Sequence, residues 1–366
     1  MGNAELQLII DACRACFSDA QPLAALPEGV DWRRVVDLTH RHRVQALCWK
    51  GLSPFADQIP QEAAAQLRSQ AAAVVASNLR IGAECNRLLG LFDGNDVDLL
   101  FLKGLALAAL AYPDPYLKMG WDIDLLVSRE QAADAFNQLR SAGYAPLTPG
   151  KASDAQLLAW HRTHKESVWH CADGDFYVEL HTRLSDNPAM LPGVGMNSHR
   201  QVARMSAGLE LPTLGPEELF AYLAVHGASS AWFRLKWAAD LAALLSFKTS
   251  AEIESLYERA LQLGAGRAAA QALLLVEQLF GVQLGHELKL RLEAGALNCW
   301  LVKIALTQIG APAEPTERPL GTATIHLSQL GLKAGWGFVL SESIRQAREI
   351  LGRAAHSSDY QVADRT

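Results

Sequence analysis

One run of residues, 99–127, limits the fold more than any other part of the chain. An apolar strand is predicted over 97–102 and ends in Lys103-Gly104, and an Ala/Leu helix is predicted over 105–112. Backbone N–H groups and the dipole at the start of such a helix favour a phosphate. Gly104 lets the backbone approach a ligand closely, and Lys103 adds a positive charge. This turn is therefore predicted to bind phosphate, although neither glycine-rich phosphate-loop pattern, G-x-x-x-x-G-K-[ST] or G-x-G-x-x-G, occurs in the chain.

Two carboxylates follow on the next predicted strand, which opens with Asp122-Ile123-Asp124. Because side chains alternate along a strand, Asp122 and Asp124 point to the same face. A later strand, 176–181, carries Glu179 on its polar face. If the two strands are neighbours, three carboxylates meet, and they repel one another unless a cation lies between them. Oxygen ligands suit Mg²⁺ or Mn²⁺, so Asp122, Asp124 and Glu179 are predicted metal ligands.

Two further residues bear on the third carboxylate. His181 shares the face of Glu179 and is assigned to the site, with a structural hydrogen bond as the alternative. Asp175 is a rival third acid, but it precedes Glu179 by four residues, or roughly 13 Å along a strand. That distance is too long for both to serve one pair of metal ions. The plainer alternatives are a solvated turn for the two aspartates and an exposed loop for Lys103.

The motif as a whole resembles a known family. The run FLKG…YPDPYLK…DIDLLV, followed by VELH, is similar to bacterial, mostly uncharacterised nucleotidyltransferases of the DNA-polymerase-β-like superfamily. The likeness covers about 90 of the 366 residues. It implies an α/β (α+β) fold, in which a small mixed sheet is flanked by helices and binds nucleotide and metal at its edge. The relatives usually carry Gly-Ser in the phosphate turn, where this chain has Lys103-Gly104, and Lys118 stands where they commonly have Arg.

The resemblance also implies an activity, the metal-dependent transfer of a nucleoside monophosphate from an NTP to an acceptor with release of pyrophosphate. In that reaction Asp122, Asp124 and Glu179 hold the metals, and Glu179 orients or deprotonates the acceptor. Contacts to the donor nucleotide are assigned to Lys103, Gly104, Lys118, His181 and Arg234. The acceptor is left open between a small molecule, a protein and RNA. Two other classes remain as alternatives, a DxD metal-dependent glycosyltransferase and a catalytically silent protein that binds a nucleotide or a partner.

Composition narrows the class of protein further. With 366 residues and 50% hydrophobic content, the chain can bury a large core, and it has no run of about 18 apolar residues that would predict a membrane span. A net charge of −6 argues against a protein that coats nucleic acid. The first residues lack signal-peptide features, which predicts a cytoplasmic location. Six scattered cysteines, with Cys13 and Cys16 as the one close pair, predict reduced thiols and no disulfide framework.

Helical patterns flank the predicted sheet on both sides. We expect three regions: an N-terminal helical region at 1–94, the nucleotidyltransferase core at 95–190 and a C-terminal helical domain at 191–366. Apolar residues recur with a period near 3.6 in several flanking segments, which predicts helices. These segments are 4–18, 31–52, 60–93, 216–227, 232–247, 250–281, 286–309 and 338–354.

Two polar segments outside the motif leave alternatives open. Residues 39–43 form a basic cluster that fits either a solvated helix face or a contact with an anionic substrate. The segment 226–240 is rich in polar and aromatic groups. In one interpretation Lys236 and Asp240 form an ion pair one helical turn apart. In the other, a tryptophan of this segment stacks on a nucleobase and Arg234 meets a phosphate.

Overall fold

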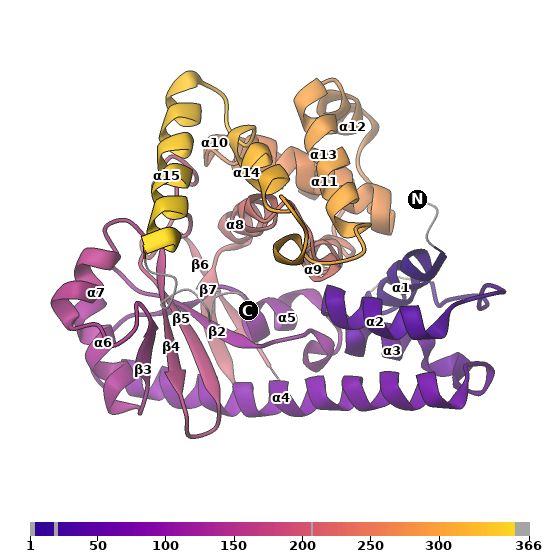
Figure 1. The fold of residues 1–366 in the computed structure, drawn as a ribbon, viewed down its shortest axis with the longest axis horizontal. Helices are drawn as coiled ribbons and strands as arrows, with labels where there is room; N and C mark the ends of the chain where they lie inside the picture. Colours follow the sequence, from indigo (N-terminus) through magenta and orange to yellow (C-terminus); the bar gives the residue numbers. More distant parts are fainter. Residues whose placement is uncertain (1–3, 18–20, 206–207, 356–366) are drawn as a thin grey trace.

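A computed structural model describes residues 4–17, 21–205 and 208–355 as a helix-rich α+β protein (Figure 1). The strands are β1 (Leu100–Phe101), β2 (Asp122–Leu126), β3 (Ala145–Thr148), β4 (Glu166–Cys171), β5 (Phe176–His181), β6 (Arg200–Arg204) and β7 (Glu210–Leu214). Five of them form one sheet with the order β1-β2-β5-β4-β3, and β6 and β7 form a separate hairpin. β2 and β5 run parallel, whereas the other neighbours in the large sheet are antiparallel. The expected small mixed sheet is confirmed.

Helices surround the sheet. They are α1 (Ala4–Arg14), α2 (Trp32–His42), α3 (Gln45–Leu52), α4 (Gln61–Asp93), α5 (Gly104–Ala111), α6 (Ala132–Ser141), α7 (Asp154–Trp160), α8 (Pro216–Ser229), α9 (Leu235–Leu245), α10 (Ser250–Gln262), α11 (Gly266–Phe280), α12 (His286–Glu293), α13 (Ala296–Ile309), α14 (Ala323–Leu330) and α15 (Trp336–Ala355). In Figure 1 the long α4 runs beneath both the sheet and the N-terminal helices, while α8 to α15 lie on the opposite side. The sheet therefore has helices on both sides, as the α+β prediction required.

Two predicted helical segments are divided in the structure at residues with positive φ, and a third, 286–309, becomes α12 and α13 with a break at residues 294–295. The segment 31–52 becomes α2 and α3, because Arg43 adopts a left-handed φ of 55° and ends the first helix. The segment 250–281 becomes α10 and α11, with a break at Gly264, whose φ is 80°. A glycine marks the second break, but an arginine in this conformation gives no comparable sequence signal.

The hydrophobic core is shared by both ends of the chain. Buried residues of α1 to α3 belong to the same cluster as those of α8 to α13, and this cluster extends from Leu6 to Phe338. A second cluster packs one face of the large sheet against α4 and α6, and it includes Phe92, Phe136 and Trp169. Burying a large apolar side chain contributes roughly 1.5–3 kcal/mol. Packing thus fixes one face of the sheet and leaves the other face for polar residues.

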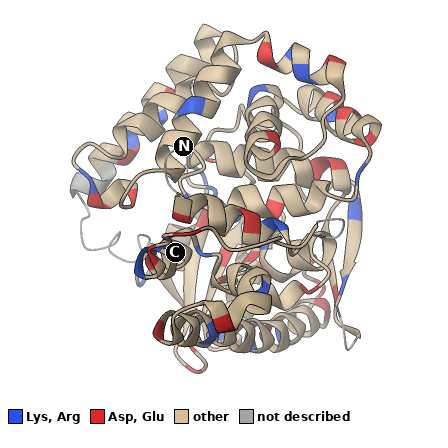
Figure 2. Cartoon of the chain, turned by 90° about the vertical axis from the view of Figure 1, so that its right-hand side faces the viewer, with Lys and Arg blue, Asp and Glu red and all other residues tan. Residues whose placement is uncertain are grey.

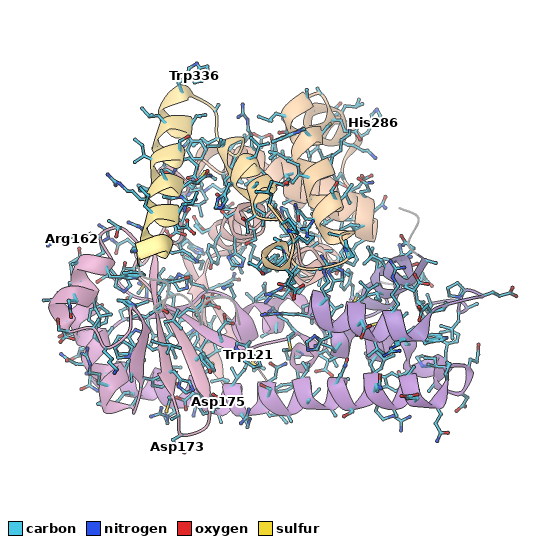
Figure 3. All side chains as sticks on the ribbon, viewed as in Figure 1. Trp121, Arg162, Asp173, Asp175, His286 and Trp336 are labelled. Carbon is cyan, nitrogen blue, oxygen red and sulfur yellow. The ribbon has the colours of Figure 1, made fainter. Side chains whose placement is uncertain are left out.

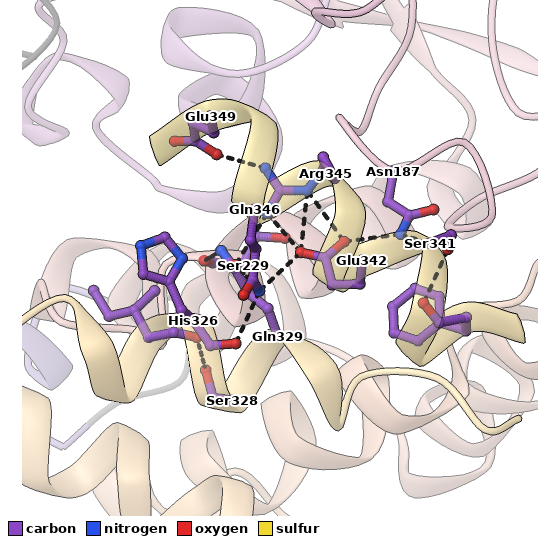
Figure 4. Close-up of polar contacts among 12 residues, drawn as sticks. Asn187, Ser229, His326, Ser328, Gln329, Ser341, Glu342, Arg345, Gln346 and Glu349 are labelled. Atoms are coloured by element: carbon purple, nitrogen blue, oxygen red, sulfur yellow. Dashed lines mark hydrogen bonds and ion pairs between the residues drawn. The ribbon is translucent and has the colours of Figure 1, made fainter. Parts of the chain in front are cut away.

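A polar network fastens α14 and α15 to the rest of the protein (Figure 4). Glu342 on α15 is 3% exposed and accepts hydrogen bonds from Asn187 Nδ2 (2.8 Å) and Arg345 Nε (3.1 Å). Gln329 on α14 donates to the carbonyl of Ser229 at the end of α8 (2.7 Å). These bonds hold the last two helices beside α8.

The distribution of charge is mixed. Figure 2 shows basic and acidic residues interspersed along the helices and strands. No helix in the described ranges is both long enough and apolar enough to cross a bilayer. All six cysteines lie within these ranges and are free thiols.

Candidate functional site

Two strands bring predicted site residues together on the polar face of the sheet. β2 and β5 are parallel neighbours, with Asp124 opposite Glu179 and Asp122 opposite Tyr177. Asp124 and Glu179 are 4% and 7% exposed. Together with the fully buried His181 they offer three ligand atoms that all lie within 4.8 Å of one another. The predicted pairing of the two strands is confirmed, while Asp122 lies outside this close group.

The Lys103-Gly104 turn lies beside these acids. The N–H of Leu102 donates to the carbonyl of Asp124 (3.1 Å), which holds the end of β1 against β2. Gly104 begins α5 with a φ of 59°, a left-handed conformation that strains other residues. A Cβ at this position would lie 3.7 Å from the carbonyl oxygen of Asp122. This is an ordinary contact distance, so the positive φ is what favours glycine here. The turn lies beside the acidic strand, and its binding of phosphate stays a prediction.

Two cations contact the acids directly. Lys103 Nζ lies 2.7 Å from Asp124 Oδ1 and 3.7 Å from Glu179 Oε2. His181 Nε2 lies 3.2 Å from the same Asp124 oxygen and 3.6 Å from the same Glu179 oxygen. Its other ring nitrogen, Nδ1, is buried without a hydrogen-bond partner among the residues that the structure describes. Lys103 is thus no exposed loop lysine, and His181 lies within the acidic group.

A fourth acid, Glu166, belongs to this group and was not predicted. β4 pairs with β5 so that Glu166 stands opposite His181, and its Oε2 lies 3.2 Å from His181 Nε2. Lys165 Nζ lies 2.6 Å from the same carboxylate oxygen. The sequence does contain a signal from which Glu166 could have been predicted. Asp173-Gly174, just before the strand of Glu179, is typical of a hairpin turn. That turn predicts an antiparallel partner strand over the preceding residues, and hence the position of Glu166.

Burial and charge act in opposite directions on the acidic group. Burial raises the pKa of Asp124 and Glu179, but the charges of Lys103 and His181 outweigh it and lower both pKa values. Burial lowers the pKa of His181, yet the charge of Glu166 and the hydrogen bonds to Asp124 and Glu179 raise it to about 9. Burial also opposes the charge of Lys103, but the two carboxylates raise its pKa well above the ordinary value. At neutral pH both carboxylates are therefore ionised and both bases are charged.

A cavity of about 410 Å³ opens over this face of the sheet. Lys118 lies in its wall, and Lys118 Nζ is 3.4 Å from Asp240 Oδ2, while the Tyr112 hydroxyl donates to Asp240 Oδ1 (2.9 Å). The expected ion pair between Lys236 and Asp240 is wrong, because Asp240 pairs with Lys118. Lys236 is half-buried in the cavity wall, and burial lowers its pKa to about 7 although the charge of Asp122 opposes this shift. The cavity thus combines carboxylates with several basic groups.

The α8–α9 connection supplies another part of the cavity wall. Arg234 lies there with its guanidinium in a paired contact with Glu314, at 2.8 Å from Nε and 2.7 Å from Nη2. Phe233 and Trp237 line the cavity and pack edge to face with ring centroids 4.9 Å apart. Trp232 is fully buried. Of the two tryptophans predicted to stack on a base, only Trp237 faces the cavity.

The basic cluster at the end of α2 is solvated only in part, since His40 is exposed. Thr39 and His42 are buried. Arg41 donates hydrogen bonds of 3.0 Å to the carbonyls of Gln308 and Ile309 at the end of α13. The solvated-face interpretation is therefore wrong for Thr39, Arg41 and His42, since Arg41 satisfies a helix C-terminus.

The rival third acid lies elsewhere. Asp175 is at the tip of the β4–β5 hairpin, and its Oδ1 is 2.9 Å from His170 Nε2. Its side chain is 68% exposed. Figure 3 shows Asp173 and Asp175 together at this tip, at the lower edge of the molecule. Asp175 therefore contributes nothing to the acidic group around Asp124.

The donor set suits a divalent ion. Carboxylate oxygens of Asp124 and Glu179 lie side by side, and Asp122 lines the same cavity. Such oxygen ligands are those that Mg²⁺ and Mn²⁺ prefer. When charged, His181 donates hydrogen bonds to the carboxylates through Nε2, and when neutral it offers one further ligand atom to the same group. The residues present therefore fit a divalent metal site built on carboxylates.

A comparison with models of protein families assigns the chain to one family. The model of the family described as "Uncharacterised nucleotidyltransferase" matches residues 28–281, well over half of the chain. The chain belongs to this family. A comparison with curated proteins finds no match. In this nucleotidyltransferase family member the matched range contains the whole large sheet, the acidic group and α8 to α11, whereas α12 to α15 lie beyond it.

Proposed function

We propose that this protein is a metal-dependent nucleotidyltransferase that moves a nucleoside monophosphate from an NTP to an acceptor and releases pyrophosphate. The observation that carries the proposal is the meeting of Asp124 and Glu179 on neighbouring strands beside the Lys103-Gly104 turn. Family membership supports nucleotidyl transfer in general. The order of phosphate turn, Asp-x-Asp and a distant Glu also supports membership of the DNA-polymerase-β-like superfamily.

The carboxylates have two tasks in this proposal. Asp122, Asp124 and Glu179 hold Mg²⁺ or Mn²⁺, which when bound offsets phosphate charge and polarises the α-phosphoryl group. Glu179, the acid beside Lys103 and His181, orients the acceptor hydroxyl and accepts its proton. The acceptor oxygen then forms a bond to the α-phosphorus as the bond from that phosphorus to pyrophosphate breaks. His181 keeps Asp124 and Glu179 in position through its Nε2 contacts.

The donor nucleotide is held by the turn beside the carboxylates and by other groups of the cavity wall. Gly104 presents backbone N–H groups at the start of α5, and Lys103 and Lys118 supply positive charge. Arg234 lines the cavity and is held in place by Glu314, which positions its guanidinium for the proposed contact with donor phosphate. The exposed ring surface of Trp237 beside Phe233 is suited to stack on a base.

The test is a donor and acceptor screen with the purified full chain. Each α-labelled NTP is incubated with Mg²⁺ or Mn²⁺ and a cell extract, and labelled RNA, protein and small molecules are separated. Transfer of label with matching release of pyrophosphate supports the proposal. Transfer of sugar from a UDP-sugar with release of UDP would instead identify the glycosyltransferase alternative, and a metal-dependent rise in melting temperature without turnover would identify a silent binding protein.

A further inference from the structure

Lys103 and a metal ion compete for the same oxygen atoms. Lys103 Nζ lies 2.7 Å from Asp124 Oδ1, one of the ligand atoms that face each other across β2 and β5. It also approaches Glu179 Oε2 at 3.7 Å. The side chains of Asp124 and Glu179 are only 2% and 10% exposed, so water screens these charges little. The ammonium group thus serves as the counter-ion of both carboxylates.

This arrangement is incompatible with a divalent ion at the same place. A divalent ion binds a carboxylate oxygen at about 2.1 Å. On Asp124 Oδ1 it would lie within about 5 Å of the ammonium, and two cations in a poorly hydrated site repel each other strongly. Binding there therefore requires Lys103 to move. Its flexible four-carbon side chain and three donor hydrogens permit a change of partner.

The neighbouring cavity offers such a partner. Lys103 and Gly104 both line the 410 Å³ cavity, and Lys103 directly precedes the backbone turn that is suited to phosphate. A polyphosphate bound at this turn carries more negative charge than either carboxylate. Its oxygens are therefore a competing site for the ammonium group.

We propose that Lys103 is a displaceable counter-ion that couples the binding of donor nucleotide to the binding of metal. Without nucleotide it neutralises Asp124 and Glu179 and keeps metal affinity low. When donor phosphates occupy the turn, the ammonium moves to them and leaves the carboxylates to the metal. The inference rests on the proposed function and adds to it a positioning role for Lys103, which makes the two binding events mutually favourable.

The experiment measures Mn²⁺ binding to the full chain by the EPR signal of free Mn²⁺, with and without a non-hydrolysable NTP analogue. Lys103→Met is expected to bind Mn²⁺ about tenfold more tightly than the wild type when no nucleotide is present, within the usual range of coupling between sites. Because nucleotide phosphates also coordinate Mn²⁺ directly, the contribution of Lys103 is the difference between wild type and variant. The gain in Mn²⁺ affinity caused by the analogue should be smaller in Lys103→Met.

Two variants control this comparison. Lys118→Met removes the same charge from the same cavity, but Lys118 pairs with Asp240 rather than with Asp124. Its Mn²⁺ affinity without nucleotide should therefore stay near that of the wild type, and this variant is compared only in the absence of nucleotide because Lys118 is assigned to the donor phosphates. Lys103→Arg keeps the charge and should keep Mn²⁺ affinity low, which separates charge from any loss of folding in Lys103→Met.

The results that overturn the inference differ from those that overturn the proposed function. If Mn²⁺ affinity without nucleotide is the same in the wild type and in a folded Lys103→Met, or rises equally in Lys118→Met, the inference is wrong while the metal site stands. If Lys103→Met unfolds, the neutral and polar Lys103→Gln takes its place: tighter Mn²⁺ binding by Lys103→Gln than by Lys103→Arg supports the inference, whereas equal binding by the two contradicts it. If the wild type binds no Mn²⁺ even with the analogue, the proposed function fails and the inference fails with it.

Discussion

Two buried acidic groups in this molecule are built in different ways. Glu342 on α15 has Arg345 three residues away on the same helix, with contacts down to 2.5 Å, and a further donor in Asn187. Asp124 and Glu179 are as deeply buried but belong to two strands. They share Lys103 and His181 at distances from 2.7 to 3.7 Å.

The difference shows how a buried acid that fastens a helix is distinguished from a candidate ligand site. We call Glu342 with Arg345 and Asn187 the fastening group, and Asp124 with Glu179 the sheet group. Burial raises the pKa of Glu342, but hydrogen bonds from Arg345 and Asn187 outweigh it and lower the pKa, so donors satisfy this carboxylate. The sheet group faces a cavity and holds a further acid, Glu166, within 3.2 Å of His181. A satisfied carboxylate fixes a helix in place, whereas crowded acids beside a cavity are typical of a site that binds cations.

The largest expected effect separates these two groups directly. Asp124→Asn removes a predicted metal ligand from the centre of the sheet group, so transfer should fall on the order of 10³-fold, which corresponds to several kcal/mol of lost transition-state stabilisation. Pyrophosphate release under saturating NTP and Mg²⁺ measures it. Circular dichroism should show the same fold as the wild type. Unchanged turnover in Asp124→Asn would contradict the metal assignment.

A smaller loss of turnover is expected for the acid that accepts a proton. Glu179→Gln should keep NTP binding but lose about 10²-fold or more in turnover, because an amide ligates metal poorly and cannot accept the proton. Asp175→Asn is the matched control, since Asp175 lies at the exposed hairpin tip. Nucleotide titration and pyrophosphate release are measured for both variants. Loss of turnover in Asp175→Asn alone would show that the third ligand is assigned wrongly.

The fastening group should affect stability and leave the metal site alone. Glu342→Ala leaves the donors of Arg345 and Asn187 without their acceptor, which costs about 1–3 kcal/mol of the free energy of unfolding. A denaturant titration measures this loss. Mn²⁺ affinity of the folded variant should equal that of the wild type. A drop in Mn²⁺ affinity as large as that of Asp124→Asn would erase the contrast between the two groups.

The smallest expected effect is the uptake of less than one proton per protein molecule when nucleotide binds. Because the pKa of Lys236 is lowered to about 7, this amine is largely neutral at pH 8 in the free protein. Bound phosphate favours the ammonium form and raises the pKa, so nucleotide binding at pH 8 should take up protons. Calorimetry in two buffers with different ionisation enthalpies measures the uptake. Lys236→Met should abolish it, and equal uptake in both proteins would exclude Lys236 from the phosphate site.

The part of the site that follows from strand alternation was predictable from sequence. The period of two placed Asp124, Glu179 and His181 on polar faces, and the pairing of β2 with β5 brought them together. Lys118 and Asp240 pair across 122 positions, which a local i,i+4 rule cannot anticipate. That rule instead selected Lys236, which has the right spacing from Asp240 but lies in the cavity wall, where the charge of Asp122 acts on it.

Helix boundaries were less predictable where the backbone makes an unusual turn without glycine. The helix predicted to begin at residue 232 starts at Leu235, because Ala231 and Trp232 both adopt positive φ values, of 47° and 54°. Such conformations are held by tertiary packing, here by the complete burial of both side chains. Local sequence preference does not predict a break that depends on such packing, whereas a break at a glycine such as Gly264 can be predicted from the sequence.

The contact between Arg41 and the end of α13 also constrains the order of events during synthesis. The carbonyl of Ile309, to which Arg41 donates, is 268 positions later in the chain. At ordinary translation speeds the ribosome needs on the order of tens of seconds to make the intervening segment. α3 packs against both α1 and α2 as soon as it is made, whereas α9 and α11, which also pack against α1, are made only later, at Leu235–Leu245 and Gly266–Phe280. Nascent chains stalled before residue 235 should therefore be cut by protease in α1 more readily than the finished protein, and chaperones that shield exposed apolar surface should bind them there.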